Sequence, residues 1–297
     1  GPLVEKGGPC EADAILEIGF PGESGLYAVA RALAGEVNPS GRTCDLWATD
    51  LSATPSFNNF GDHTYTDVTD YYTSIGSGAH FVEYAEGIYV GYRYYETAAA
   101  EAAAGNYPGF DYDAAVTFPF GFGLSYTSFK RELLDVTHEG EDLLAKVRVS
   151  NEGQVAGRDV AQLYATAPVR RGVEKSAAVL VAFAKTDELA PGEAAELELR
   201  CCERDLASWD VSAGCWVLDA GSYAISLRSD SHTVIDQREL SLGEKRFQTD
   251  SATGNPVKNR FDDVMDYMDA CVTQLSRADF AGTFPEPAQD KTAASVG

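Results

Sequence analysis

Short runs in which apolar and polar residues alternate fill the chain from Leu133 onward. Runs such as DLLAKVRVSNEG and AAELELRCCE repeat with period two, which is typical of half-buried β-strands. Turn sequences at residues 151–153 (NEG) and 190–192 (APG) separate them. About seven strands over roughly 110 residues predict an antiparallel β-sandwich over residues 131–243. No Cys…Trp…Cys spacing of the immunoglobulin kind is evident, which favours the fibronectin type III kind.

The first part of the chain follows a different pattern. Residues 12–19 (ADAILEIG) form a short apolar run that predicts a strand, and residues 24–34 have the apolar spacing of a helix. A second strand is expected over residues 43–50. One strand and one helix cannot bury their own apolar faces. Residues 1–75 are therefore predicted to be the C-terminal part of a larger, here truncated, α/β domain.

Two aromatic stretches with interspersed glycines follow, residues 81–96 (FVEYAEGIYVGYRYYE) and 118–129 (FPFGFGLSYTSF). Glycine costs about 1 kcal/mol and proline about 3 kcal/mol in a helix, so both stretches are expected to be extended. Between them, the Ala-rich residues 97–104 predict a helix with Thr97 as its N-cap. An aromatic strand inside one domain is the alternative for the second stretch. We predict instead that the two stretches contact each other in a connecting segment over residues 76–130.

Four side chains of this connecting segment are expected to have structural roles. Phe118 and Phe120 should be buried where the two stretches meet, because each aromatic side chain can bury roughly 150–250 Å². Arg93 should lay its stem on aromatic faces and place its charged head on a carboxylate such as Glu86.

The composition changes again beyond Gly243. Residues 248–259 are polar and resemble a linker, and residues 261–276 carry apolar side chains at the spacing of an amphipathic helix. Residues 244–297 are therefore expected to form a linker and a helix. The predicted fold class is an α/β partial sandwich domain, then an all-β fibronectin type III-like sandwich, then a helical C-terminal tail.

Charge and composition exclude several classes of partner. The net charge of −23 argues against nucleic acid and anionic membrane surfaces, which attract basic patches. No apolar run approaches the roughly 20 residues of a membrane span. No basic stretch precedes an apolar one as in a signal peptide, so a cytoplasmic location is expected. The six cysteines fit no zinc or CxxC spacing, and free thiols are the favoured state.

Residue types alone assign no reaction. None of the four histidines lies in an HxH, HExxH or HxxxH arrangement, and no GxSxG, GxGxxG or Walker sequence occurs, so neither a metal nor a cofactor is expected. The carboxylates of Glu83, Glu86 and residues 208–210 (SWD) are more simply explained as structural. Two non-catalytic classes stay open beside an enzyme. One is a carbohydrate-binding module that stacks sugars on residues 84–95, and the other is an interdomain support.

Several motifs, in order along the chain, resemble glycoside hydrolase family 3. Three of them are similar to the second domain of that family: residues 12–43 (ADAILEIGFPGESGLYAVARALAGEVNPSGRT), 86–96 (EGIYVGYRYYE) and 118–129. Two are similar to its fibronectin type III-like domain: residues 159–168 (DVAQLYATAP) and 189–199 (LAPGEAAELEL). The resemblance covers about residues 4–243.

The family consists mostly of β-glucosidases and related exo-acting, retaining hydrolases. The resemblance implies an Asp nucleophile on a TIM-type barrel and a Glu acid/base from the α/β sandwich domain. Residues 259–285 resemble the lead-in to the barrel of permuted members, in which the barrel comes last. We therefore expect a fragment that holds neither catalytic carboxylate. In the full enzyme its partners would be the missing barrel domain and a β-glucoside or oligosaccharide substrate.

Phe20 and Glu23 are the substrate-binding candidates on this chain. They lie in the turn after residues 12–19, and α/β sheets place ligands beyond the carboxyl ends of their strands. The turn is expected to line the rim of a sugar pocket.

Overall fold

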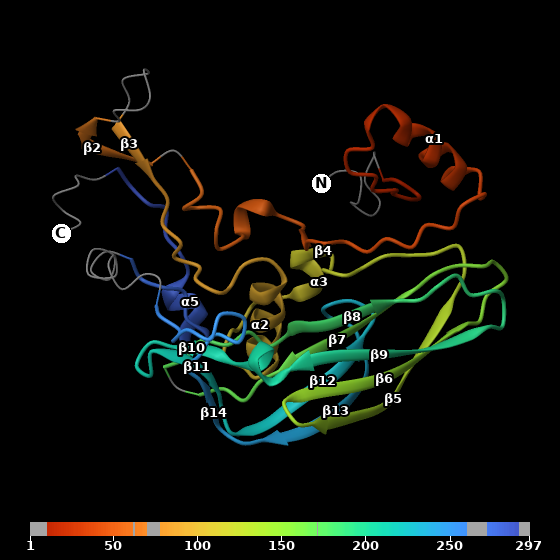
Figure 1. The fold of residues 1–297 in the computed structure, drawn as a ribbon. Coiled ribbons are helices and arrows are strands. Elements are labelled where there is room, and N and C mark those ends of the chain that lie inside the picture. The colour runs from red at the N-terminus through yellow and green to blue at the C-terminus, as the bar shows by residue number, and fades with distance from the viewer. Residues whose placement is uncertain (1–10, 62, 70–77, 171, 260–271, 291–297) are drawn as a thin grey trace.

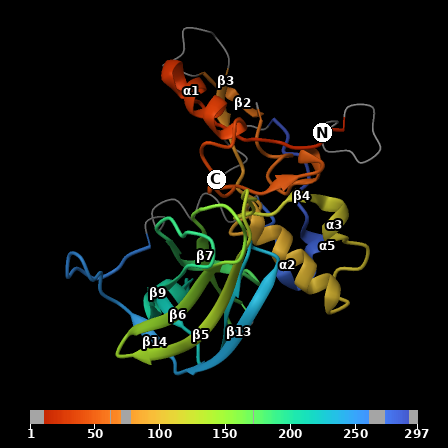
Figure 2. The ribbon, with the colours of Figure 1, turned by 90° about the vertical axis from the view of Figure 1, so that its right-hand side faces the viewer.

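The computed structural model describes residues 11–61, 63–69, 78–170, 172–259 and 272–290 of the 297. A β-sandwich forms the lower part of the molecule in Figure 1, and a small group of helices lies against it (Figure 2). Two segments project from the upper side in Figure 1. They are helix α1 (Gly22–Leu33) and the hairpin of β2 (His63–Thr69) and β3 (Gly78–Phe81).

The sandwich has two antiparallel sheets. The first has the strand order β13-β12-β7-β8 and contains β7 (Val160–Thr166), β8 (Val179–Lys185), β12 (Gly221–Arg228) and β13 (Val234–Leu242). The second has the order β5-β6-β9 and contains β5 (Phe129–Glu139), β6 (Asp142–Asn151) and β9 (Ala194–Cys202). A small third sheet combines β10 (Ser208–Asp210), β11 (Cys215–Leu218) and β14 (Lys245–Phe247), after the 3-10 turn η2 (Glu203–Leu206). The predicted β-sandwich is confirmed.

The alternation of side chains along β6 explains why this part of the sequence folds as it does. Val147 and Val149 are fully buried, whereas Arg148 between them faces solvent. The buried side chains belong to one core with Leu163 of β7 and Leu227 of β12 from the facing sheet. Period two therefore gives each strand one apolar face, and the two sheets bury these faces against each other.

A second, aromatic core lies beside the sandwich, around α2 (Tyr92–Ala103). The other elements around this core are α3 (Tyr112–Ala115), η3 (Arg277–Asp279), α5 (Phe280–Thr283) and the paired short strands β1 (Trp47–Ala48) and β4 (Val116–Phe118). The 3-10 turn η1 (Leu51–Ala53) follows β1 and is exposed. The buried members of this core are Tyr89, Tyr94, Tyr95, Ala98, Val116, Leu275 and Phe280. None of the helices in the described ranges is long and apolar enough to cross a membrane.

The predicted strands of the first part were wrong. Residues 12–19 have no regular structure and are almost entirely exposed, and the strand expected over residues 43–50 is reduced to β1. The helix expected over residues 24–34 is present as α1, although it begins two residues earlier and buries only Ala32. A strand needs a hydrogen-bonded neighbour, and residues 12–19 have none among the described residues.

Helix α2 begins five residues before the expected cap at Thr97, so the expectation that residues 92–96 are extended was wrong. Gly91 has φ 55° and ψ −136°, a backbone conformation that favours glycine, and the helix starts directly after it. Thr97 is fully buried inside the helix, where its Oγ1 donates to the Arg93 carbonyl at 2.5 Å and accepts from Ala177 N at 2.9 Å. Burial of Tyr94 and Ala98, four residues apart on one face, outweighs the strand preference of the aromatic residues.

The C-terminal tail contacts the aromatic core. The helix expected over residues 261–276 falls largely outside the described residues, and residues 272–276 are not helical. Leu275 N donates to the Ala85 carbonyl at 2.7 Å, and the Phe280 ring meets Tyr89 edge-on at a centroid distance of 5.1 Å. The tail therefore completes the core around α2.

The two aromatic stretches meet at a contact that we call the seam, formed by Tyr92, Phe120 and Tyr164. The rings of Tyr92 and Phe120 stack at 4.6 Å with an interplanar angle of 21°, and Tyr164 of β7 meets Tyr92 edge-on at 6.3 Å. The Tyr92 hydroxyl accepts a hydrogen bond from Leu180 N at 3.1 Å. The expected contact between the two stretches is present, and it also ties both to the sandwich.

Gly121 is required at the seam by its conformation and by its neighbour. Its φ is 79°, and a Cβ atom there would lie 2.1 Å from Oε1 of Gln162. Instead, Gln162 Nε2 donates to the carbonyl oxygens of Gly121 and Ser229, each at 3.0 Å. The carbonyl of Gly121 is thus fixed to the first sheet of the sandwich.

A buried carboxylate links the first part of the chain to both sheets. Asp159 is completely buried and accepts hydrogen bonds from Arg42 Nη2 at 2.5 Å and from Arg131 Nε and Nη2 at 2.6 Å each. Arg42 precedes β1, Arg131 lies on β5 and Asp159 directly precedes β7. Burial lowers the pKa of Arg42, and the charge of Asp159 acts in the opposite direction.

Phe120→Ala should destabilise the protein by about 2–3 kcal/mol. Loss of a fully buried Phe side chain costs about 3–5 kcal/mol, and Phe120 is only half-buried. Chemical denaturation of the variant and parent measures the difference. Phe183→Ala is the matched control, because Phe183 is exposed and its loss should stay within about 0.5 kcal/mol. Equal stability of the two variants would show that the seam does not hold the two parts together.

Candidate functional site

A cluster of polar side chains surrounds Glu96 at the boundary between α2 and the sandwich. Glu96 is buried, and its Oε1 accepts from the hydroxyls of Tyr112 and Ser231 at 2.7 Å each. Its Oε2 lies 2.9 Å from Nδ1 of His232, whose ring stacks on Tyr112 at a centroid distance of 3.6 Å. Arg228 Nη1 donates to the Ser231 carbonyl at 2.6 Å and completes the cluster. Every oxygen of the buried carboxylate is thus hydrogen-bonded.

Sequence reasoning missed this cluster. Glu96 ends the aromatic stretch, and the sequence separates it from His232 by 136 residues. The only available signal was a glutamate between aromatic and Ala-rich residues, where an unpaired charge would be costly. That signal indicates that a partner is required but does not identify it.

The residues predicted for a sugar-pocket rim lie on the surface. The Phe20 side chain is completely exposed, and Glu23 is exposed in the first turn of α1. The structure brings neither of them to the seam or to the Glu96 cluster. Their role in substrate binding stays a prediction.

The predicted pairing of Arg93 with Glu86 was wrong. Arg93 is exposed on α2, and no ion pair joins it to Glu86 in the described ranges. Glu86 is buried instead, and its Oε2 has no hydrogen-bond partner there. Arg93 lies in the first turn of α2 and faces solvent. Phe118 is half-buried as part of β4, with Trp47 at 5.5 Å and Phe122 at 5.3 Å.

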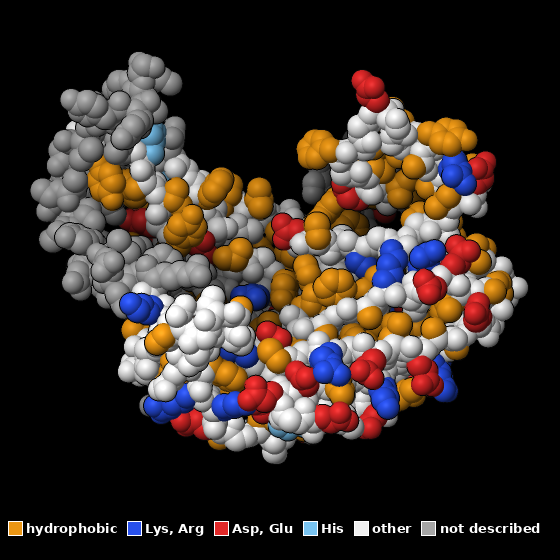
Figure 3. Space-filling model, viewed as in Figure 1, with side chains coloured by type: hydrophobic (Ala, Val, Ile, Leu, Met, Phe, Trp, Pro, Cys, Tyr) orange, Lys and Arg blue, Asp and Glu red, His pale blue; other side chains and the backbone are white. Residues whose placement is uncertain are grey.

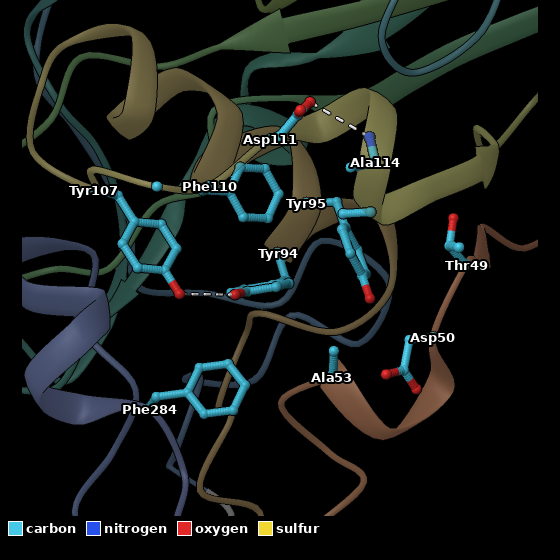
Figure 4. A pocket seen from close by; sticks show the side chains of 12 residues that line it. Thr49, Asp50, Ala53, Tyr94, Tyr95, Tyr107, Phe110, Asp111, Ala114 and Phe284 are labelled. Atoms are coloured by element: carbon cyan, nitrogen blue, oxygen red, sulfur yellow. Dashed lines mark hydrogen bonds between the residues drawn. The ribbon is translucent and has the colours of Figure 1, made fainter.

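A pocket of about 520 Å³ opens on the other side of α2 (Figure 4). Five aromatic side chains form most of its wall: Tyr94, Tyr95, Tyr107, Phe110 and Phe284. The carboxylates of Asp50 and Asp111 lie at its edge. Ligand pockets of about 300–1,000 Å³ with apolar walls and few polar groups are typical of small-molecule sites.

Both carboxylates of the pocket already cap short helices. Asp50 Oδ1 accepts from Ser52 N at 2.9 Å and from Ser52 Oγ at 2.6 Å, and these bonds lower the pKa of Asp50. Asp111 Oδ1 accepts from the backbone N atoms of Asp113 and Ala114 at 3.1 and 3.3 Å. Each aspartate keeps a second oxygen that makes no hydrogen bond among the described residues. Within those residues, no group of three or more His, Cys, Asp or Glu side chains could hold a metal ion.

The cysteines of the described ranges carry free thiols. They are Cys44, Cys201, Cys202 and Cys215. Cys201 lies in the sandwich core, and burial raises the pKa of its thiol to about 12. A thiol protonated at neutral pH is a poor nucleophile, so Cys201 is structural.

The stabilisation that His232 provides should fall as the pH rises. The hydrogen bond to Glu96 raises the pKa of His232, and the nearby charges of Asp230 and Asp113 act in the same direction. A group with a raised pKa in the folded state contributes fully below its unfolded pKa of about 6.5, and the contribution disappears as the pH passes the folded value. Denaturation at about pH 6 and about pH 8.5 should therefore show a larger cost of His232→Gln at the lower pH.

Ser231→Ala is the control for this measurement. It removes a hydrogen bond to the same carboxylate but no titrating group, so its cost should be the same at both pH values. An equally pH-independent cost for His232→Gln would mean that His232 is neutral in its contact with Glu96.

Two family matches occur in order along the chain. Residues 3–92 match the glycosyl hydrolase family 3 C-terminal domain, and residues 159–231 match the fibronectin type III-like domain. A β-glucosidase of Ruminococcus albus is 36% identical over 227 residues, which are 73% of this chain and 20% of that protein. Beta-glucosidase A of Butyrivibrio fibrisolvens is 36% identical over 221 residues, which are 68% of this chain and 23% of that protein.

Solved structures agree with these matches. The structure of β-glucosidase 3B from Thermotoga neapolitana in complex with α-D-glucose covers 74% of this chain with a TM-score of 0.59 and 34% sequence identity. The chain covers 27% of that structure, and it spans about a fifth to a quarter of the length of the curated relatives. Over the matched residues, the chain belongs to glycosyl hydrolase family 3, as part of its C-terminal domain followed by its fibronectin type III-like domain.

Proposed function

We propose that this chain is the scaffold and the outer pocket rim of a retaining, exo-acting β-glucosidase-like enzyme. The full enzyme would hydrolyse terminal β-D-glycosidic bonds of glucosides or oligosaccharides. The observation that carries the proposal is the order of the two family domains, which the seam joins in one structure that is 34% identical to a solved β-glucosidase. A cytoplasmic location stays a prediction from the sequence.

The two catalytic carboxylates are proposed to come from outside this chain. Retaining hydrolysis needs a nucleophile and an acid/base about 5–5.5 Å apart. Three of the buried carboxylates have structural partners: Glu96 is held by its cluster, Asp159 by two arginines and Asp219 by Lys175 and Arg170. Glu86 is the exception named above, because its Oε2 has no hydrogen-bond partner among the described residues. The resemblance to the family implies that the nucleophile lies on a barrel domain. The isolated chain is therefore proposed to be inactive.

Exposed apolar side chains around α1 support an interface with further parts of the enzyme. Phe20, Leu26 and Leu33 are exposed by 106%, 63% and 71%, and Figure 3 shows hydrophobic side chains over the projecting segment that holds α1. Contiguous apolar surface of this kind marks an interaction site. The position of Phe20 and Glu23 at the start of this segment is compatible with a pocket rim between two domains.

A non-catalytic carbohydrate-binding module is the alternative. Tyr84 favours it, because the ring is 68% exposed and an exposed ring can stack on the apolar face of a sugar. Binding of glucose or cellobiose by the isolated chain, lost in Tyr84→Ala, would support this alternative.

The isolated 297-residue chain should not hydrolyse 4-nitrophenyl β-D-glucoside, because it is proposed to lack both catalytic carboxylates. Release of nitrophenol by the purified chain is the measurement. Turnover that persists through purification, and that a substitution such as Glu23→Gln abolishes, would contradict the proposal.

A chimera tests the proposal directly. Replacement of the aligned segment of the Ruminococcus albus β-glucosidase by this chain should give a folded enzyme that hydrolyses the same substrate. In the chimera, Phe20→Ala should raise KM with little change in kcat, since a rim residue contributes to binding rather than to the chemical step. Val211→Ala, at an exposed position of the sandwich, should change neither value. A folded chimera without activity would argue against the proposed function.

A further inference from the structure

We propose that the aromatic pocket beside α2 binds a small planar phenol, that is, a flat aromatic ring that carries a hydroxyl group. The inference rests on the walls and the polar groups of the pocket and not on the proposed glycosidase function. It therefore stands or fails independently of that function.

The wall is built to receive a flat ring. Tyr107 and Phe110 stack at 5.7 Å with an interplanar angle of 16°, and Tyr94 meets Phe110 and Phe284 edge-on at 6.2 and 6.1 Å. Figure 4 shows these rings around the open space, with the Tyr94 hydroxyl directed to that of Tyr107. Aromatic rings prefer stacked or edge-to-face neighbours at centroid distances of about 4.5–7 Å. The aromatic ring of a ligand can therefore stack on these side chains or meet them edge-on.

One end of the pocket holds an unused donor and an unused acceptor. Tyr95 is only 3% exposed, and its buried hydroxyl has no hydrogen-bond partner among the described residues. Figure 4 shows this hydroxyl directed toward Asp50 and Ala53. Burial and, secondly, the charge of Asp50 raise the pKa of Tyr95 to about 12, so the hydroxyl stays protonated.

A ligand hydroxyl complements this pair. It can accept from the Tyr95 hydroxyl and donate to the Asp50 carboxylate oxygen Oδ2, which the cap of η1 does not use. A buried hydroxyl without a partner is costly, which explains why a ligand that provides one would bind here.

A sugar fits the same pocket less well. A pyranose carries several hydroxyls, and each one that is buried without a partner costs free energy. Beyond Tyr95 and Asp50 the wall offers few free polar groups among the described residues, since Thr49 Oγ1 lies 3.2 Å from Thr117 Oγ1 and Asp111 has only Oδ2 free while its Oδ1 caps α3. A ring with one or two hydroxyls and an otherwise apolar surface matches both the aromatic wall and the polar end formed by Tyr95 and Asp50.

Fluorescence titration of the full chain with 2-naphthol tests the proposal, because a volume of about 520 Å³ accommodates a two-ring phenol. Saturable binding is expected. Tyr95→Phe should weaken binding of 2-naphthol about three- to tenfold, as expected for one hydrogen bond, and should leave binding of naphthalene unchanged. Tyr95→Phe should also melt at or slightly above the temperature of the parent, because the hydroxyl makes no bond within the protein.

Tyr84→Phe is the matched control, since this exposed tyrosine lies outside the pocket and its loss should not change 2-naphthol binding. Three outcomes would overturn the proposal. They are the absence of saturable binding, an unchanged affinity of Tyr95→Phe for 2-naphthol, and displacement of 2-naphthol by methyl β-D-glucopyranoside at lower concentrations than by phenol.

Discussion

The buried charge of Asp159 is the constraint on which the arrangement of the whole chain depends. A fully buried carboxylate must be paired, and Arg42 and Arg131 supply three hydrogen bonds from two different parts of the sequence. Removal of one partner of a buried ion pair costs about 3–5 kcal/mol, mainly because it leaves an uncompensated charge. The ion pair therefore holds the segment before β1 against the sandwich.

Helix α2 lies between the sandwich and the aromatic core and contacts both. Thr97 and Glu96 face the sandwich, where they bond to Ala177, Ser231 and His232. Tyr94, Tyr95 and Ala98 face the aromatic core and the pocket. A displacement of the helix would disturb a hydrogen-bonded surface on one side and aromatic contacts on the other. The seam at Tyr92 and Phe120 holds the N-terminal end of this helix in place.

This division fits the proposed role of the chain as a support for an active site on another domain. The Glu96 cluster and the Asp159 ion pairs are directional hydrogen bonds, so they fix the orientation as well as the position of α2 and of the segment before β1 on the sandwich. The projecting segment with α1 keeps an apolar surface exposed, in contrast to the tightly bonded seam. A rigid support with one open apolar surface is what a neighbouring catalytic domain would need for precise placement.

The sequence alone determined the β-sandwich, the resemblance to glycoside hydrolase family 3 and the contact between the two aromatic stretches. Period-two alternation in strands such as β6 is local and follows directly from burial on one side, so it is readable in residues that are adjacent in the chain. Only the tertiary structure decided that residues 92–96 are helical, because the burial of Tyr94 and Tyr95 against Phe110 and Phe280 outweighs their strand preference. It also decided the partners of Glu96 and Asp159, which lie more than 100 residues away along the chain in the cases of His232 and Arg42. Buried charges indicate that a partner exists, but which residue it is depends on how the sheets and α2 come together in space.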